Sequence, residues 1–164
     1  INTMLFPVYI GAHSVIMPSS HFAKKPYVWL KAISDYRGTI CGGPNFSFDL
    51  CCDSVSEEQL TTLDLSCWEI AYNAAEPIRV ETLRRFAEHF SPTGFQYSFL
   101  YPCYGMAEAT VFVTSIARKA GPVIRYFDHE DLKAGRLNEV QHATGGRKII
   151  GLAGCGFELS LIHI

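Results

Sequence analysis

The sequence lacks a strong charge of either sign, and this absence excludes one class of partner. Its 164 residues include 14 Lys and Arg against 16 Asp and Glu, a formal net charge of -2 at pH 7. The basic residues are scattered, so they create no field that would attract a nucleic-acid backbone. With 48% apolar and 18% charged residues, the composition is typical of an ordinary globular domain. We therefore expect no nucleic-acid partner.

The sequence also lacks a metal-binding cysteine pattern and a long apolar run. None of its six cysteines forms a Cys-x-x-Cys pair or has a histidine at ligand spacing, so no zinc site is predicted. Thiols without a disulfide-like pattern favour a reducing compartment, and we expect a cytoplasmic protein. The longest apolar stretch, Met4–Ala12, is interrupted by Pro7 and is shorter than the about 20 residues that span a bilayer. Neither a membrane span nor a signal peptide is expected.

Strand-like and helix-like stretches alternate along the chain, which predicts an α/β fold. The predicted helices are 26–37, 57–63, 77–90 and one starting near Gly105, and the predicted strands are 39–41, 68–72 and 96–101. The helix over 77–90 has the clearest apolar stripe, and Glu81 and Arg85 are expected to pair across one of its turns.

The segment Tyr101–Thr110 places an aromatic ring, a glycine and a carboxylate at a predicted strand-to-helix junction. Such a junction lies at the carboxyl edge of a sheet, where α/β proteins bind ligands. Tyr104 could stack on a base, Gly105 lets the backbone approach a nucleotide, and Glu108 could hold a magnesium ion. From spacing alone, a core tyrosine and a first-turn acid that favours the helix dipole fit these positions as well.

Several motifs resemble those of fatty acyl-AMP ligases, a branch of the adenylate-forming superfamily. Tyr104–Thr110 (YGMAEAT) is similar to the superfamily's nucleotide motif, with Ala107 where this branch has alanine instead of threonine. Trp68–Pro77 (WEIAYNAAEP) resembles the adenine-pocket strand and turn, with Ala74 where glycine is usual. Gly42–Cys51 (GGPNFSFDLC) is similar to a glycine-proline-asparagine loop of the family.

The resemblance implies an enzyme that uses ATP and Mg²⁺ to join a fatty acid to AMP. The acyl-adenylate would pass to an acyl carrier protein or to a carrier domain of a polyketide or nonribosomal synthase. Glu108 would be the catalytic residue that holds magnesium. Residues implied to bind ATP or AMP are Ala74, Ala75, Glu76, Tyr104, Gly105, Met106 and Ala107. Residues implied to border the acyl chain are Gly43, Pro44, Asn45 and Met106.

The resemblance covers residues 1–156, which we interpret as a fragment of the large N-terminal domain, incomplete at both ends. Residues 121–146 resemble the insertion that restrains the C-terminal domain in acyl-AMP ligases. Residues 157–164 are expected to be a non-native tail, because Leu159–Ile164 reads as a translated sequencing adaptor. In the insertion, Asp128, Glu130 and Asp131 form either a solvated face or a loose cation site.

Two other functions stay open. An acyl-CoA synthetase would share most of these motifs, and a non-catalytic nucleotide- or acyl-binding module would need only part of them. The family's phosphate-gripping loop, ribose-binding aspartate and C-terminal lysine are absent from this sequence, so we expect the isolated chain to be inactive. We also expect poor solubility, because a sheet cut out of a larger domain exposes strand edges and apolar faces. Cys103 is not expected to be a nucleophile, because no histidine lies near it in sequence.

Overall fold

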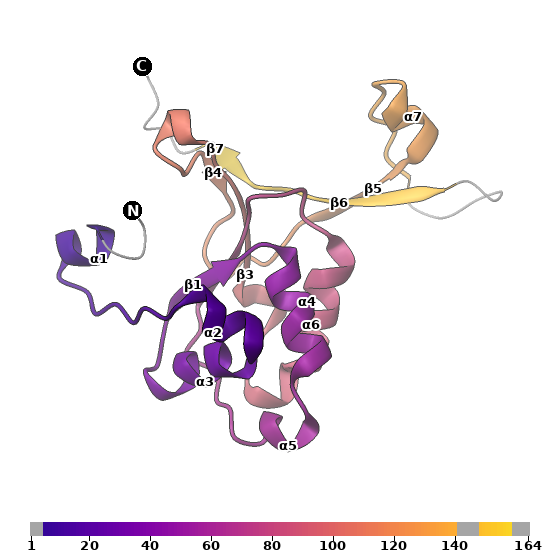
Figure 1. Cartoon of the computed structure of the whole chain (residues 1–164). Helices are drawn as coiled ribbons and strands as arrows, with labels where there is room; N and C mark the ends of the chain where they lie inside the picture. The colour runs from indigo at the N-terminus through magenta and orange to yellow at the C-terminus, as the bar shows by residue number, and fades with distance from the viewer. Residues whose placement is uncertain (1–4, 141–147, 159–164) are drawn as a thin grey trace.

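A computed structural model of the chain describes residues 5–140 and 148–158. Its α-helices are α1 (Leu5–Ile10), α2 (Ser19–Lys24), α3 (Tyr27–Asp35), α4 (Asn45–Ser54), α5 (Glu57–Leu60), α6 (Val80–His89) and α7 (His129–Lys133). Its strands are β1 (Ile40–Gly43), β2 (Ile70–Asn73), β3 (Leu100–Tyr104), β4 (Thr114–Ser115), β5 (Ile124–Asp128), β6 (Ile149–Ala153) and β7 (Phe157–Glu158). Figure 1 shows their arrangement.

The main sheet has the order β1-β2-β3-β4-β7. Strands β1, β2 and β3 run parallel, and β4 and β7 continue the sheet in antiparallel pairing. The chain passes from β1 to β2 through α4 and α5, and from β2 to β3 through α6. A parallel pair needs such a crossover, since a tight turn can only reverse the chain. The alternation of strands and helices confirms the predicted α/β class.

One buried aromatic cluster joins three helices to the sheet. Trp68, which precedes β2, is fully buried, and its ring lies 5.3 Å from Trp29 of α3 and 6.0 Å from Phe86 of α6. Phe48 of α4 stacks on the same indole at 6.3 Å. The Trp68 Nε1–H donates to the backbone oxygens of Cys41 and Ile70, so the indole carries no unsatisfied polar group into the core.

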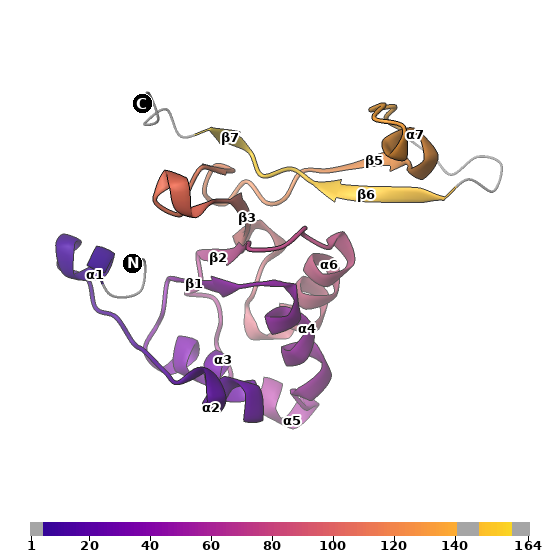
Figure 2. The same cartoon turned by 45° about the horizontal axis from the view of Figure 1, so that its top comes forward.

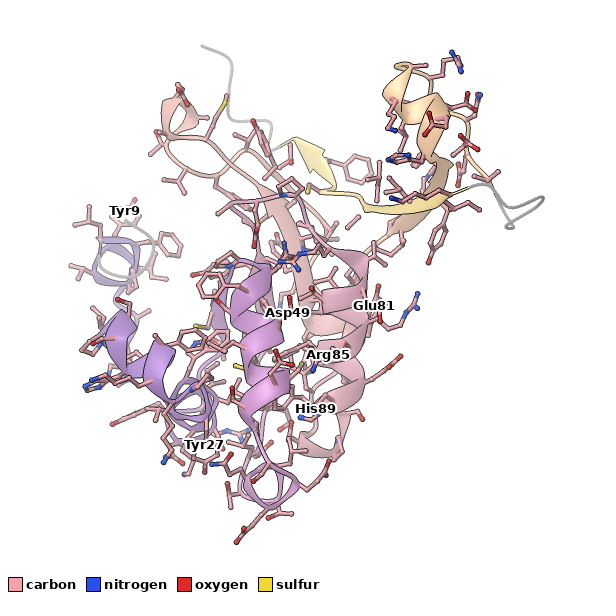
Figure 3. The ribbon with its side chains drawn as sticks, turned by 45° about the vertical axis from the view of Figure 1, so that its right-hand side comes forward. Tyr9, Tyr27, Asp49, Glu81, Arg85 and His89 are labelled. Carbon is pink, nitrogen blue, oxygen red and sulfur yellow. The ribbon has the colours of Figure 1, made fainter. Side chains whose placement is uncertain are left out.

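Helix α6 lies side by side with α4, and the two helices are also linked by charge (Figure 3). Arg85 of α6 pairs with Asp53 of α4 at 2.5 Å. Glu81 pairs instead with Arg84 at 3.7 Å. The predicted Glu81–Arg85 pair is therefore wrong, because the Arg85 guanidinium pairs with the Asp53 carboxylate of the neighbouring helix.

Two predicted elements around β3 are also corrected. Residues 96–101 were predicted as a strand, but Tyr97–Phe99 forms a 3₁₀ turn and the strand begins at Leu100. The turn brings the buried rings of Phe95 and Phe99 to 5.7 Å, which an extended chain would separate. The helix predicted near Gly105 is a single 3₁₀ turn, Ala107–Ala109, because the chain reverses there into β4.

Residues 121–140 and 148–153 form an antiparallel arm, in which β5 pairs with β6 and α7 lies at the far end (Figures 1 and 2). The arm contacts α6, where an Arg84 guanidinium nitrogen lies 3.4 Å from the Tyr126 hydroxyl. Gly151 of β6 sits between the Tyr126 ring and Val80, and a Cβ there would lie 3.0 Å from the ring. The arm is thus anchored to the body through its β-strands.

The acidic residues of the arm have structural partners. Asp128 is buried and caps α7 by accepting from the backbone N–H groups of Glu130 and Asp131. Asp131 pairs with Arg136 at 2.6 Å. Within residues 5–140 and 148–158, no cluster of three or more His, Cys, Asp or Glu is placed to hold a metal ion. The structure thus disfavours the cation-site alternative for this face.

The C-terminal tail is described only in part. Phe157 and Glu158 form β7 and pair with β4, whereas Leu159–Ile164 and residues 141–147 of the predicted insertion lie outside the described residues. The non-native origin of the tail stays a prediction. Among the described helices, none has the length and apolar character that a bilayer crossing requires.

We expect Phe86→Ala to destabilise this fold strongly. Phe86 is fully buried, and its ring lies 4.8 Å from Phe48 and 5.0 Å from Phe95. Truncation would leave a cavity and lower the free energy of unfolding by about 3–5 kcal/mol. Chemical denaturation measures the change, and Tyr36→Ala, at a side chain that is 60% exposed, is the control, expected within about 0.5 kcal/mol of the unmodified protein. Equal effects of the two substitutions would contradict the packing described here.

Candidate functional site

The candidate site lies where the three parallel strands end. Gly43 pairs with Asn73, and Asn73 pairs with Pro102, so the loops that follow β1, β2 and β3 leave the sheet at one edge. Every residue that the resemblance assigns to ATP, magnesium or the acyl chain lies in these loops or at the end of an element that borders them. The parallel topology thus brings together three motifs that are far apart in sequence.

The loop after β3 is a compact reversal that depends on Gly105. The backbone N–H groups of Val111 and Val113 donate to the oxygens of Met106 and Tyr104, both at 3.0 Å. A Cβ on Gly105 would overlap the carbonyl oxygen of Val111. The glycine is therefore required by the close return of this loop, in addition to any approach of a nucleotide.

The same loop presents side chains to solvent. Tyr104 is 52% exposed and Met106 is 44% exposed, with the tyrosine hydroxyl 3.9 Å from the methionine sulfur. Glu108 is exposed, and its carboxylate has no hydrogen bond or ion pair to the described part of the chain. Of the two interpretations of Tyr104 that spacing left open, the structure excludes the core tyrosine. An unpaired carboxylate can accept a cation without breaking an existing contact.

Backbone strain is concentrated beside Glu108. Thr110 has φ 55° and Val111 has φ 84°, in the left-handed region that β-branched residues rarely adopt. Such a conformation costs of order 1–3 kcal/mol per residue and is found mainly at functional sites. The strain is consistent with a functional role for this loop.

The turn after β2 also contains a left-handed residue. Ala75 has φ 75°, whereas Ala74, which stands where the family has glycine, does not have a positive φ. Alanine at position 74 therefore needs no strained backbone, and the strain lies one residue later. Glu76 is exposed, but one oxygen of its carboxylate accepts from the backbone N–H of Asn45 at 2.8 Å.

Asn45, at the start of α4, connects the first two loops. Its side-chain amide donates to the oxygen of Pro77 at 2.9 Å, and its side-chain oxygen accepts from the N–H of Arg79 at 3.1 Å. Asn45 is fully buried. The resemblance implies a place beside the acyl chain for Asn45, but its fully buried side chain bonds the segment after β2 instead. Nothing in the spacing shows which distant turn a buried amide will meet.

Asn73 is a site residue that sequence reasoning missed altogether. It is fully buried at the end of β2, its side-chain amide donates to the oxygen of Gly43 at 3.3 Å, and its own backbone oxygen accepts from the Cys103 thiol at 3.8 Å. Asn73 thereby joins all three strand ends. A polar residue at the end of an otherwise apolar strand was the signal that could have indicated it.

Cys103 has no feature of a nucleophile. It is buried, and desolvation, with a smaller contribution from Cys155, raises the pKa of its thiol to about 11. At neutral pH the thiol is therefore protonated and poorly reactive. This agrees with the expectation from the sequence.

A shallow, open depression lies elsewhere, on the α6 side. It is lined by Arg84, Ala87, Glu88, Ser91, Phe95 and Tyr97. None of the predicted site residues borders it, so this depression is separate from the candidate site at the sheet edge.

The chain belongs to the AMP-binding enzyme family, whose pattern matches residues 1–139. It is 40% identical over 137 residues to a medium-chain-fatty-acid–[acyl-carrier-protein] ligase of Teredinibacter turnerae, covering 84% of this chain and 21% of that protein. A ligase of the same description from Moorena producens is 37% identical over 158 residues, covering 95% of this chain and 26% of the relative. The chain thus spans about a quarter of the length of these relatives.

The fold matches solved structures of the same group. A fatty acid AMP ligase of Legionella pneumophila superimposes with a TM-score of 0.89 at 35% identity, covering 96% of this chain and 27% of that chain. A fatty acyl-adenylate ligase of L. pneumophila in complex with acyl adenylate and pyrophosphate gives a TM-score of 0.88 over the same shares of the two chains. These matches confirm the α/β fold of adenylate-forming enzymes and the resemblance to fatty acyl-AMP ligases.

We expect Gly105→Ala to open the loop after β3. The added methyl group would collide with the Val111 carbonyl, and relief by backbone movement should cost about 1–3 kcal/mol. Amide hydrogen exchange at Val111 and Val113, whose N–H groups close the loop, should become faster. Gly38→Ala is the matched control, because its Cβ would meet Ile33 at an ordinary 3.6 Å. Unchanged exchange in Gly105→Ala would show that the loop does not need the glycine.

Proposed function

We propose that the complete protein activates a fatty acid with ATP, forming an acyl-adenylate that is transferred to a carrier protein. The observation that carries this proposal is the 40% identity to a medium-chain-fatty-acid–[acyl-carrier-protein] ligase across the segment that contains all three edge loops. The polyketide or nonribosomal carrier domain expected from the sequence is a finer form of the same proposal. Six free thiols in the structure agree with a reducing, cytoplasmic location.

The loop after β3 is proposed to hold the nucleotide and its metal. The exposed Tyr104 ring would lie against adenine, and the backbone from Gly105 to Ala107 would border the nucleotide. Glu108 fits a magnesium site, because its exposed carboxylate has no partner among the described residues. Magnesium would supply charge neutralisation at the phosphates, while Glu108 would fix its position.

The other two loops are proposed to place the reactants relative to each other. Ala74, Ala75 and the backbone at Glu76 would form the adenine edge. Gly43, Pro44 and Met106 would border the acyl chain, whereas Asn45, assigned to the same side by the resemblance, is fully buried and would lie beneath them. In this chemistry the fatty acid carboxylate attacks the α-phosphorus, and pyrophosphate leaves. The protein's contribution is mainly to hold the carboxylate in line and to stabilise negative charge.

Residues 121–146, of which 121–140 lie in the arm, are proposed to be the insertion of acyl-AMP ligases. The strands of the arm contact α6 and each other through Tyr126 and Gly151, so the arm is anchored to the body. A segment anchored in this way can bias the orientation of a second domain between two positions. The proposed result is that the acyl-adenylate is kept from coenzyme A.

We expect Glu108→Gln to lower the rate of adenylation in the complete protein. A neutral amide is a poor magnesium ligand, and loss of one positioned charge typically costs about 3 kcal/mol, or a hundredfold or more in rate. Fatty-acid-dependent pyrophosphate exchange measures the rate, and fatty-acid affinity should be nearly unchanged. Glu81→Gln, at an exposed position of α6, is the control. Full activity of Glu108→Gln at limiting magnesium would remove Glu108 from the metal site.

The proposed role of the arm predicts a change in product for Tyr126→Ala. This substitution removes both the packing on Gly151 and the contact with Arg84, while β5 and β6 can still pair. Acyl-CoA should then form, and acyl-adenylate synthesis should continue. The measurement is acyl-CoA yield with coenzyme A present, with Tyr36→Ala as the surface control. Efficient acyl-CoA formation by the unmodified protein would contradict the ligase assignment and favour an acyl-CoA synthetase.

A further inference from the structure

Asn45 offers no surface to a ligand, although it lies in the loop assigned to the acyl chain. Its exposed fraction is zero, and its side chain already bonds the oxygen of Pro77 and the N–H of Arg79. Both partners belong to the turn and the segment that follow β2. The buried Asn45 amide, which belongs to the loop on the acyl side, therefore fixes the position of the turn on the nucleotide side.

Glu76 makes the reciprocal contact. Its carboxylate reaches from the turn after β2 to the N–H of Asn45, the first residue of α4. The first N–H groups of a helix have no partner within it, and the helix dipole favours a negative charge at this end. Pro44 precedes Asn45 as the N-cap and makes no side-chain cap bond. Glu76 thus supplies the cap that the local sequence does not.

These bonds connect two loops that are separated by about thirty residues in sequence. Asn73 adds a fourth hydrogen bond, which its side-chain amide donates to the Gly43 oxygen. The loop from Gly43 to Asn45 and the turn from Ala74 to Pro77 are consequently one hydrogen-bonded unit. Three of the hydrogen bonds in this unit involve Asn45. Because Asn45 is fully buried, water cannot replace a hydrogen-bond partner that a substitution removes.

We propose that the side chains of Asn45 and Glu76 are a positioning pair, which sets the distance between the acyl and nucleotide subsites and contacts neither substrate. This inference rests on the proposed function of the sheet edge. Adenylation needs the fatty acid carboxylate in line with the α-phosphorus, and a displacement of about 1 Å can cost a hundredfold in rate. The pair acts on the rate of the bound complex, and each substrate still binds its own side of the unit.

The test uses the complete protein with Asn45→Ala, Glu76→Ala, Glu76→Gln and the double alanine variant. Each alanine variant should lower kcat by about ten- to hundredfold. This kcat is expressed per active site, and the number of active sites is taken from the stoichiometric burst of acyl-adenylate. Dissociation constants for ATP and fatty acid, each measured alone, should change by less than about threefold. Glu76→Gln should recover most of the lost rate, because an amide oxygen still accepts from Asn45. The double variant should be about as slow as the slower single variant, since both restrain the same turn.

Thr82→Val is the matched structural control. It removes the hydrogen bond from Thr82 to Asp49 in the same α4–α6 interface and leaves every bond of the two loops in place. It should lower the melting temperature without changing kcat per active site. An unchanged kcat per active site in Asn45→Ala would reduce the pair to a stability role. A Glu76→Gln variant as slow as Glu76→Ala would show that Glu76 acts through its charge, which also overturns the proposal.

Amide exchange separates this inference from the proposed function. The Arg79 N–H donates to Asn45 and should lose protection in Asn45→Ala whether or not the protein adenylates fatty acids. If the unmodified protein forms no acyl-adenylate, the proposed function fails, and the role assigned to the pair in catalysis fails with it. If the protein is active but Arg79 keeps its protection in Asn45→Ala, the pair does not hold the turn and the inference alone is overturned.

Discussion

The burial of Trp68 among rings from three helices is the interaction on which the rest of the structure depends. Its indole contacts Trp29, Phe48 and Phe86 and bonds the backbone at β1 and β2. Burial of this amount of aromatic surface is the largest favourable contribution that a small domain has available. Because the indole bonds both strands, the same contact that packs α3, α4 and α6 also fixes where β1 and β2 lie. The position of the sheet edge follows from it.

The edge in turn depends on polar contacts that the core alone would not specify. Apolar packing tolerates small displacements, whereas a buried hydrogen bond does not, because an unmade bond costs about 1–3 kcal/mol. The bonds of Asn45, Asn73 and Glu76 are of this kind. They lie between the strand ends, where the loops leave the sheet. Aromatic burial therefore places the edge, and the amides set its detailed geometry.

Sequence reasoning succeeded where a pattern reports on one local element. The stripe of Leu83, Phe86 and Phe90 predicted α6, and all three side chains are fully buried. The motifs around Glu76 and Glu108 predicted membership of the AMP-binding enzyme family. Reasoning failed where a neighbouring element decides the outcome. Arg85 pairs with Asp53 of α4, and residues 105–112 turn back into β4 instead of continuing as a helix.

The sequence by itself determined the α/β class and the family, and it indicated most of the residues proposed for the candidate site, because periodicity and motif order are properties of the chain alone. Only the tertiary structure decided what these residues do to one another. It showed that Ala75, Thr110 and Val111 of the candidate site have left-handed backbone, and that Asn45 is buried against the turn holding Glu76. The physical reason is that burial and hydrogen bonding join groups about thirty residues apart, and their pairing is settled only when the strands take their register.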